Sequence, residues 1–186
     1  MEENLTQEQS LIKRIVICGP ESTGKSTLTK NLSDYFKTNY VEEFARDFLQ
    51  QKWNNKQEVC TQEDLIEIAR GQIESENLKI KNSIKSIFCD TNILTTIAWS
   101  KTHFSGYCDP WLERQAKVLK YDYYLILNTD IPWIKDDLRD SPNDREKMFI
   151  AHKLELDNLN VNYNIIDGSD FKKRFNLAVE FIKNIY

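Results

Sequence analysis

The stretch that decides the fold is Arg14–Thr27, RIVICGPESTGKST. Its apolar start, Arg14–Cys18, predicts a buried strand, and the rest matches the phosphate-loop pattern G-x-x-x-x-G-K-[ST]. Glycines permit the tight turn that brings backbone N–H groups onto phosphate oxygens at a helix N-terminus. The alternative is a polar turn that only starts a helix. We expect a nucleoside triphosphate to be held by Gly19, Pro20, Glu21, Ser22, Thr23, Gly24, Lys25, Ser26 and Thr27.

The rest of the chain alternates short apolar runs with longer segments that carry apolar residues at helical spacing. The strand candidates are Arg14–Cys18, Tyr40–Val41, Ser86–Cys89, Tyr123–Leu127 and Val161–Ile166. The helix candidates are Lys25–Phe36, Glu63–Ile84, Asn92–Trp99, Pro110–Lys120, Asp144–Leu159 and Lys172–Ile185. Such alternation predicts a three-layer α/β fold with parallel strands, whose ligand lies at the carboxyl ends of the strands.

Length and composition limit the other possibilities. The 186 residues correspond to about one domain, expected over 13–186, with an N-terminal tail over 1–12. A formal net charge of −4 disfavours nucleic-acid binding, and no apolar run approaches the ~18 residues of a membrane span. The polar start MEENLTQEQS is unlike a signal peptide, so we expect a cytoplasmic protein with a small-molecule partner and no nucleic-acid or membrane partner. The sequence predicts no particular oligomeric state.

Two residues are candidates for holding Mg²⁺, and a third reaches the phosphates. Lys25 should contact the β- and γ-phosphates, and the Ser26 hydroxyl should ligate Mg²⁺. Asp90 directly follows the third strand candidate, which places a carboxylate at the same sheet edge. A carboxylate in this position holds Mg²⁺ directly or through water. Its alternative role is to cap the helix that follows.

The second strand candidate ends in Glu42-Glu43-Phe44-Ala45-Arg46-Asp47, at the same edge. In a kinase, a carboxylate such as Glu43 can orient an acceptor hydroxyl and take its proton, and Arg46 can order that carboxylate. The alternative is an ion pair on the surface of a new helix.

A charged segment with two prolines, Ile131–Arg145, follows the fourth strand candidate. Its arginines, Arg139 and Arg145, suit a lid over about 131–146 that closes on the transferring phosphate. A solvated helix and turn would explain the same charges. Trp133 could stack on a flat ligand or anchor the core.

Four motifs, in this order and spacing, resemble the ribosylnicotinamide kinase domain of the NadR family: GPESTGKSTL, EFARDF, CDTN and IPWIKDDLRD. The resemblance covers about Lys13 to Ile182. It implies a P-loop kinase fold with a five-stranded parallel sheet and a helical lid. It also implies ATP and Mg²⁺ as donor and cofactor, and the ribose 5′-hydroxyl of nicotinamide riboside as acceptor, which would give nicotinamide mononucleotide.

The resemblance also implies a role for each matching residue. The catalytic residues would be Lys25, Asp90, Glu43, Arg139 and Arg145. Glu43, Arg46, Asp90, Asn92 and Trp133 would bind the nucleoside, and Gly168 would lie beside adenine. The family often has Asp-Thr-Asp where this chain has Asp90-Thr91-Asn92. The family's adenylyltransferase and DNA-binding segments have no counterpart motif here, so we expect neither function.

Two other functions are open at this point. The chain could be a P-loop kinase for another nucleoside or nucleotide. It could also be an ATP-dependent regulatory or binding module that hydrolyses ATP slowly and signals through the lid. Carboxylates and an arginine beside the phosphate loop favour a kinase, because a switch needs no acceptor pocket.

Overall fold

The computed structural model describes residues 4–135, 138 and 143–186. Its strands are β1 (Lys13–Cys18), β2 (Tyr40–Val41), β3 (Ser86–Asp90), β4 (Tyr123–Leu127) and β5 (Tyr163–Ile166). Its helices are α1 (Lys25–Phe36), α2 (Phe44–Lys56), α3 (Asp64–Ile80), α4 (Ile93–His103), α5 (Pro110–Val118), α6 (Arg145–Asn158) and α7 (Phe171–Lys183). All strand pairs are parallel, in the order β2-β3-β1-β4-β5, which confirms the predicted α/β fold.

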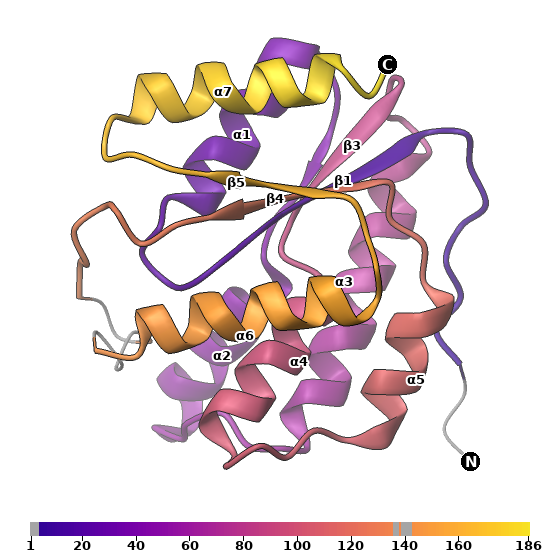
Figure 1. The fold of residues 1–186 in the computed structure, drawn as a ribbon. Helices are drawn as coiled ribbons and strands as arrows, with labels where there is room; N and C mark the ends of the chain where they lie inside the picture. Colours follow the sequence, from indigo (N-terminus) through magenta and orange to yellow (C-terminus); the bar gives the residue numbers. More distant parts are fainter. Residues whose placement is uncertain (1–3, 136–137, 139–142) are drawn as a thin grey trace.

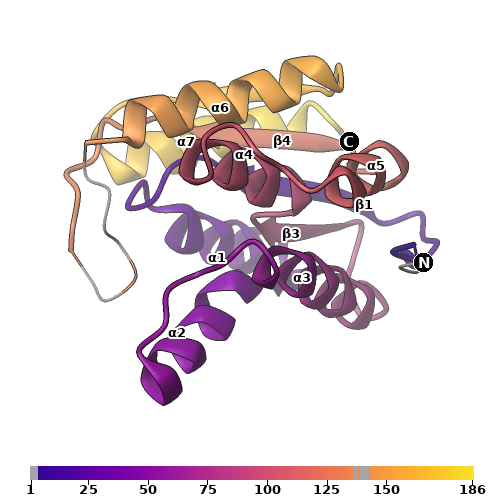
Figure 2. The same cartoon turned by 90° about the horizontal axis from the view of Figure 1, so that it is seen from below.

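Helices cover both faces of the sheet, which is why the strands are apolar without alternation. Figure 1 shows α1 and α7 over one face and α3, α4, α5 and α6 over the other. Along β1, Val16 and Cys18 belong to the core beneath α3 and α4, whereas Ile15 and Ile17 belong to the core beneath α1 and α7. Figure 2 shows α2 beyond α3, away from α6, at the margin of the molecule.

The strand order creates the crevice for the site. The central strand β1 pairs with β3 on one side and with β4 on the other. The chain therefore adds β2 and β3 on one side of β1 and then β4 and β5 on the other, so the strand order reverses at β1. Asp90, the last residue of β3, is in register with Ile17, one residue before the end of β1. The loop after β1 and the loop after β3 therefore meet at the carboxyl edge, where open α/β sheets bind ligands.

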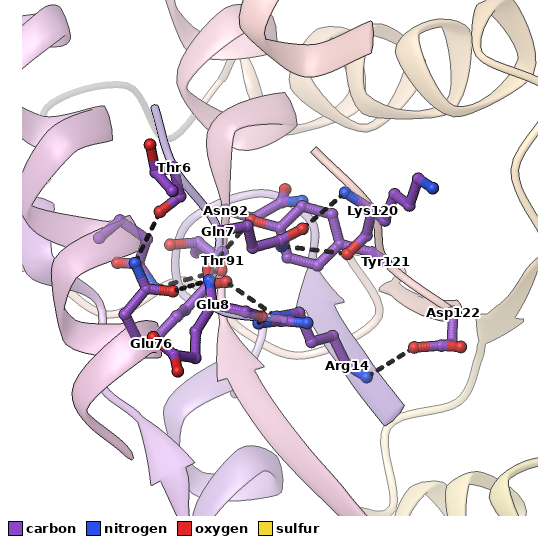
Figure 3. A network of polar contacts seen from close by, with 12 residues as sticks. Thr6, Gln7, Glu8, Arg14, Glu76, Thr91, Asn92, Lys120, Tyr121 and Asp122 are labelled. Carbon is purple, nitrogen blue, oxygen red and sulfur yellow. Dashed lines mark hydrogen bonds and ion pairs between the residues drawn. The ribbon is translucent and has the colours of Figure 1, made fainter. Parts of the chain in front are cut away.

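The N-terminal segment, predicted as a tail, is hydrogen-bonded to the domain over the residues described. The backbone N–H of Leu5 donates to Gln115 of α5 (2.8 Å), and that of Glu8 donates to Asn77 of α3 (2.7 Å). Figure 3 shows the segment beside the buried Glu76, which accepts a hydrogen bond from the Tyr121 hydroxyl (3.1 Å). Burial raises the pKa of Glu76 to about 8.

No helix within the described residues combines the length and the hydropathy needed to cross a membrane.

Candidate active site

The phosphate loop connects β1 to α1, and two of its positions require glycine. Gly19 has φ +129°, and a Cβ there would lie 2.6 Å from the Leu127 carbonyl oxygen of β4. Gly24, the N-cap of α1, has φ +84°, and a Cβ there would lie 3.1 Å from the Phe171 ring. Larger residues would therefore strain the backbone and push against neighbours at both ends of the loop.

The loop is ordered by its own side chains. The buried Thr23 hydroxyl donates to the Pro20 carbonyl oxygen (2.8 Å), and the Lys25 ammonium donates to the same oxygen (2.9 Å). Lys25 is the first residue of α1, so its charge lies beside the unpaired amides of the first helical turn. Together these groups form an anion site of the kind that binds phosphates.

Arg174 of α7 supports the loop from behind, and the sequence analysis did not identify it. Its guanidinium donates to the carbonyl oxygens of Thr23 (2.8 Å), Asn128 (2.7 Å) and Ile166 (3.1 Å). The residue is only 2% exposed. Arg174 thus links the phosphate loop to the ends of β4 and β5. The sequence alone does not predict this role, because an arginine on an amphipathic helix gives no sign of which backbone groups it contacts.

Replacing Arg174 by Met is expected to destabilise the protein, because three buried carbonyl groups lose their charged donor. Charged hydrogen bonds contribute about 1.5–3 kcal/mol each and are not additive, so we expect a loss of about 3 kcal/mol in the free energy of unfolding. Urea denaturation measures it. The matched control is Arg114→Met on the exposed face of α5, which should change the free energy by less than about 0.5 kcal/mol. Equal effects of the two variants would contradict this role of Arg174.

Asp90 ends β3 at the carboxyl edge of the sheet and is 2% exposed. It is not among the described residues that line the cavity beside the phosphate loop. Burial and the negative charge of Glu43 raise the pKa of Asp90 to about 7, against the opposing effects of Lys25, of a hydrogen bond with Ser26 and of Arg46. Its Oδ1 atom has no hydrogen-bond partner among the described residues. The alternative role as a helix cap is wrong, because Asn92 is the N-cap of α4.

The Ser26 hydroxyl and the Asp90 carboxylate fit a magnesium ion. Mg²⁺ is usually held by one or two carboxylates, with phosphate oxygens and waters completing its shell. No cluster of three or more His, Cys, Asp or Glu side chains suited to a metal occurs within the described residues. One carboxylate oxygen and one hydroxyl beside a phosphate loop are too few ligands to enclose an ion. They suit a Mg²⁺ ion that is also bound by the phosphate oxygens of a nucleotide.

Glu43, the N-cap of α2, and Arg46, in its first turn, line the same cavity as the phosphate loop. Asn92 also lines the cavity, but its side chain is used by the fold: Oδ1 accepts from the Leu94 N–H (3.1 Å) and Nδ2 donates to the Tyr124 hydroxyl (3.0 Å). The predicted contact of Asn92 with the acceptor stays a prediction.

Part of the segment after β4 is described, and two of its described residues form hydrogen bonds with the phosphate loop. The Trp133 indole donates to the Glu21 carboxylate (2.8 Å), and the Arg145 guanidinium donates to the Ser22 carbonyl oxygen (3.3 Å). Arg145 lines the cavity, whereas Trp133 is not among the described residues that do. Arg139 lies outside the described residues. The contact of Trp133 with nicotinamide stays a prediction.

The cavity itself has a volume of about 270 Å³ and two chemically different ends. One end is formed by the phosphate loop. The other is largely apolar and includes the stacked rings of Trp99 and His103, whose centroids are 4.1 Å apart. Gly168 is not among the described residues that line it; Gly168 has φ +92° and donates its N–H to Asp130 (2.7 Å).

Comparison with curated proteins finds relatives of the same description in two bacteria. The chain is 27% identical over 176 residues to the trifunctional NAD biosynthesis/regulator protein NadR of Escherichia coli K12, and 26% identical to that of Salmonella typhimurium LT2. The match covers 94% of this chain and 43% of each relative, so the chain spans less than half the length of these proteins.

Comparison with solved structures supports the fold. NadR in complex with NR superposes with a TM-score of 0.81 at 19% identity, over 94% of this chain and 52% of that chain. Thymidylate kinase from Candida albicans superposes with a TM-score of 0.65 at 16% identity, over 93% of this chain and 92% of that one. Both share the α/β architecture with this chain. The family model described as AAA domain matches residues 14–174, and the chain therefore belongs to this family.

Proposed function

We propose that this chain is an ATP-dependent kinase that phosphorylates the ribose 5′-hydroxyl of nicotinamide riboside and releases nicotinamide mononucleotide. The observation that carries the proposal is that one cavity joins Lys25 of the phosphate loop to Glu43 and Arg46 of α2. Support comes from the NadR relatives, whose description names NAD biosynthesis, and from the solved NadR structures, one with NR and one with NAD and AMP-PNP.

The residues at the donor end divide the work of phosphoryl transfer. The loop amides and Lys25 bind the β- and γ-phosphates of ATP, and Arg145 places a second positive charge on the same cavity. Ser26 and Asp90 would hold Mg²⁺, which supplies positive charge at the phosphate oxygens. Positive groups fixed around the transferring phosphoryl group stabilise the charge that develops on it.

The acceptor hydroxyl is activated from the α2 side. Glu43 accepts the proton of the 5′-hydroxyl while that oxygen forms a bond to the γ-phosphorus. The bond from the γ-phosphorus to the bridging oxygen breaks, and ADP leaves with the electron pair. Arg46, two residues further into α2 than Phe44, lines the same cavity, and its positive charge orders the Glu43 carboxylate.

The apolar end of the cavity suits the base of the nucleoside. Trp99 and His103 present stacked rings there, with Leu65, Ile68 and Met148 nearby on the lining. A flat ring can pack against such a surface, and a positively charged pyridinium is attracted by the face of an indole. The nicotinamide ring of the riboside is both flat and positively charged, whereas thymine and adenine are flat but uncharged.

A kinase for another nucleoside is the second candidate, since thymidylate kinase and deoxyadenosine kinase structures have the same fold, with TM-scores of 0.65 and 0.58. Steady-state ADP release with nicotinamide riboside, thymidine or adenosine as acceptor separates the two. We expect kcat/KM for nicotinamide riboside to exceed the others by at least about tenfold, equivalent to about 1.4 kcal/mol of transition-state binding. Faster turnover of thymidine or adenosine would favour the second candidate, and ADP release that ignores every acceptor would point to a regulatory module.

A further inference from the structure

A buried glutamine on α3, Gln72, joins the two segments that carry the carboxylates of Glu43 and Asp90. Gln72 is 4% exposed and lines the cavity, yet its carboxamide is used by the backbone on both sides. Oε1 accepts a hydrogen bond from the Phe44 N–H (3.0 Å), and Nε2 donates to the Thr91 carbonyl oxygen (3.4 Å). One side chain therefore contacts the residue after Glu43 and the residue after Asp90.

The bond to Phe44 acts as a helix cap supplied by another helix. Phe44 is the first residue of α2, and its N–H has no partner within the helix. The N-cap residue Glu43 makes no capping hydrogen bond with its own side chain in the part of the chain that is described. Gln72 thus satisfies the first amide of α2, and the Glu43 carboxylate, which caps no described amide of this helix, lines the cavity.

The bond to Thr91 stabilises a strained turn. Thr91 has φ +68°, a conformation that is costly for a β-branched residue and that persists where surrounding contacts hold it. Its N–H donates to the Ile17 carbonyl oxygen (2.9 Å), and its carbonyl oxygen accepts from Gln72. The turn fixes the direction in which the chain leaves Asp90 to enter α4, so holding Thr91 also holds Asp90.

The neighbouring residue of Gln72 reinforces the contact with α2. Gly71 lies in the middle of α3, where glycine costs about 1 kcal/mol relative to alanine. A Cβ at Gly71 would lie 2.1 Å from the Phe44 ring, so only glycine lets that ring approach. The side chain of Phe44 packs on Gly71 while its backbone is bound by Gln72, and the start of α2 is thereby held on α3 at two points.

We propose that Gln72 is a positioning residue that sets the distance and orientation of Glu43 relative to Asp90. It thereby governs affinity for the acceptor more than affinity for ATP, because its two hydrogen bonds go to Phe44 and Thr91 and not to the phosphate loop. The inference rests on the proposed function, because the acceptor end of the cavity is assigned there. Gln72 lies on the α3 side, away from the Arg174 contacts that hold the phosphate loop. Loss of its two hydrogen bonds should therefore affect the two substrates unequally.

The test is a comparison of both KM values in Gln72→Met. The Met side chain has a similar length and makes neither hydrogen bond, so we expect the acceptor KM to rise at least about tenfold and the ATP KM to change less than about twofold. The amide of Phe44 should exchange its hydrogen at least about tenfold faster. The matched control is Gln115→Met, because Gln115 is also buried and bonds the N-terminal segment instead. It should leave both KM values unchanged.

A second variant separates the two hydrogen bonds of Gln72. In Gln72→Glu the side chain still accepts from the Phe44 N–H but cannot donate to Thr91, so protection of the Phe44 amide should persist while the acceptor KM rises. An unchanged acceptor KM in both variants, or equal rises in the two KM values, would overturn the proposal. If the wild-type protein does not phosphorylate nicotinamide riboside, the proposed function fails. Hydrogen exchange of the Phe44 amide then tests the Gln72 contacts without any activity: faster exchange in Gln72→Met supports them, and unchanged exchange refutes them.

Discussion

Lys25→Ala is expected to lower kcat for phosphoryl transfer by about 10³-fold, the largest effect that we foresee for a single substitution. The Lys25 ammonium already lies over the loop, 2.9 Å from the Pro20 carbonyl oxygen, so it needs little movement to meet a phosphate. Its charge would act mainly on the γ-phosphoryl group as negative charge develops there. Single-turnover kinetics with ATP and nicotinamide riboside measure the loss without interference from product release.

The matched control is Lys30→Ala on the same helix. Lys30 forms an exposed ion pair with Asp34 (2.8 Å), and exposed i,i+4 pairs contribute about 0.3–0.5 kcal/mol to stability. We therefore expect kcat within about twofold of the wild-type value. A Lys25 variant that retains wild-type turnover, or a Lys30 variant that loses as much, would contradict the assignment of the phosphate loop as the donor site.

Asp90→Asn is expected to lower kcat by about 10²- to 10³-fold and to raise the Mg²⁺ concentration required for half-maximal rate. An amide keeps the size of the side chain and can still accept a hydrogen bond from Ser26. It lacks the negative charge that would hold Mg²⁺, so the loss isolates that charge. Titrating Mg²⁺ at saturating ATP gives both quantities.

The same substitution should stabilise the protein when nucleotide and Mg²⁺ are absent. The pKa of Asp90 is raised to about 7 in the folded state, so the folded protein holds the proton of Asp90 more tightly than the unfolded chain does. The resulting contribution to the free energy of unfolding is fully present below the unfolded pKa of 3.8 and is lost as pH rises through 7. At pH 8 the wild-type protein holds a buried charge that Asn does not carry, and the variant should be more stable by several kcal/mol. Asp122→Asn is the control: Asp122 accepts from the Arg14 N–H at the opposite end of the sheet (2.8 Å), so turnover should be unchanged. A destabilised Asp90 variant would contradict this account of the site.

Features set by neighbouring residues could be predicted from the sequence. The strands were recognisable as short apolar runs because both faces of the sheet are covered, and the phosphate loop because its glycines occupy backbone conformations that other residues avoid. The positions of Glu43 and Asp90 at one edge followed from parallel pairing, which brings the ends of successive strands together.

Features set by distant residues could not be predicted. The helix α2 was not among the helix candidates, and a new helix there was considered only as the alternative interpretation of Glu43 and Arg46. It buries none of its residues and so lacks a strong apolar stripe. Arg174 and Gln72 act on backbone groups far away along the chain, and a polar residue on a helix gives no sign of such a partner. The close approach of the Phe44 ring to Gly71 is another contact between residues far apart in the sequence.

The most direct test of the central claim is to follow the γ-phosphate itself. ATP labelled at the γ-position is incubated with the wild-type protein, Mg²⁺ and nicotinamide riboside, and both products are quantified, with mass spectrometry locating the new phosphate. We predict nicotinamide mononucleotide phosphorylated on the 5′-oxygen, formed in equal amounts with ADP and lost in the Lys25→Ala control. ADP formed at the same rate with and without nicotinamide riboside, with the label recovered as free phosphate, would contradict the account.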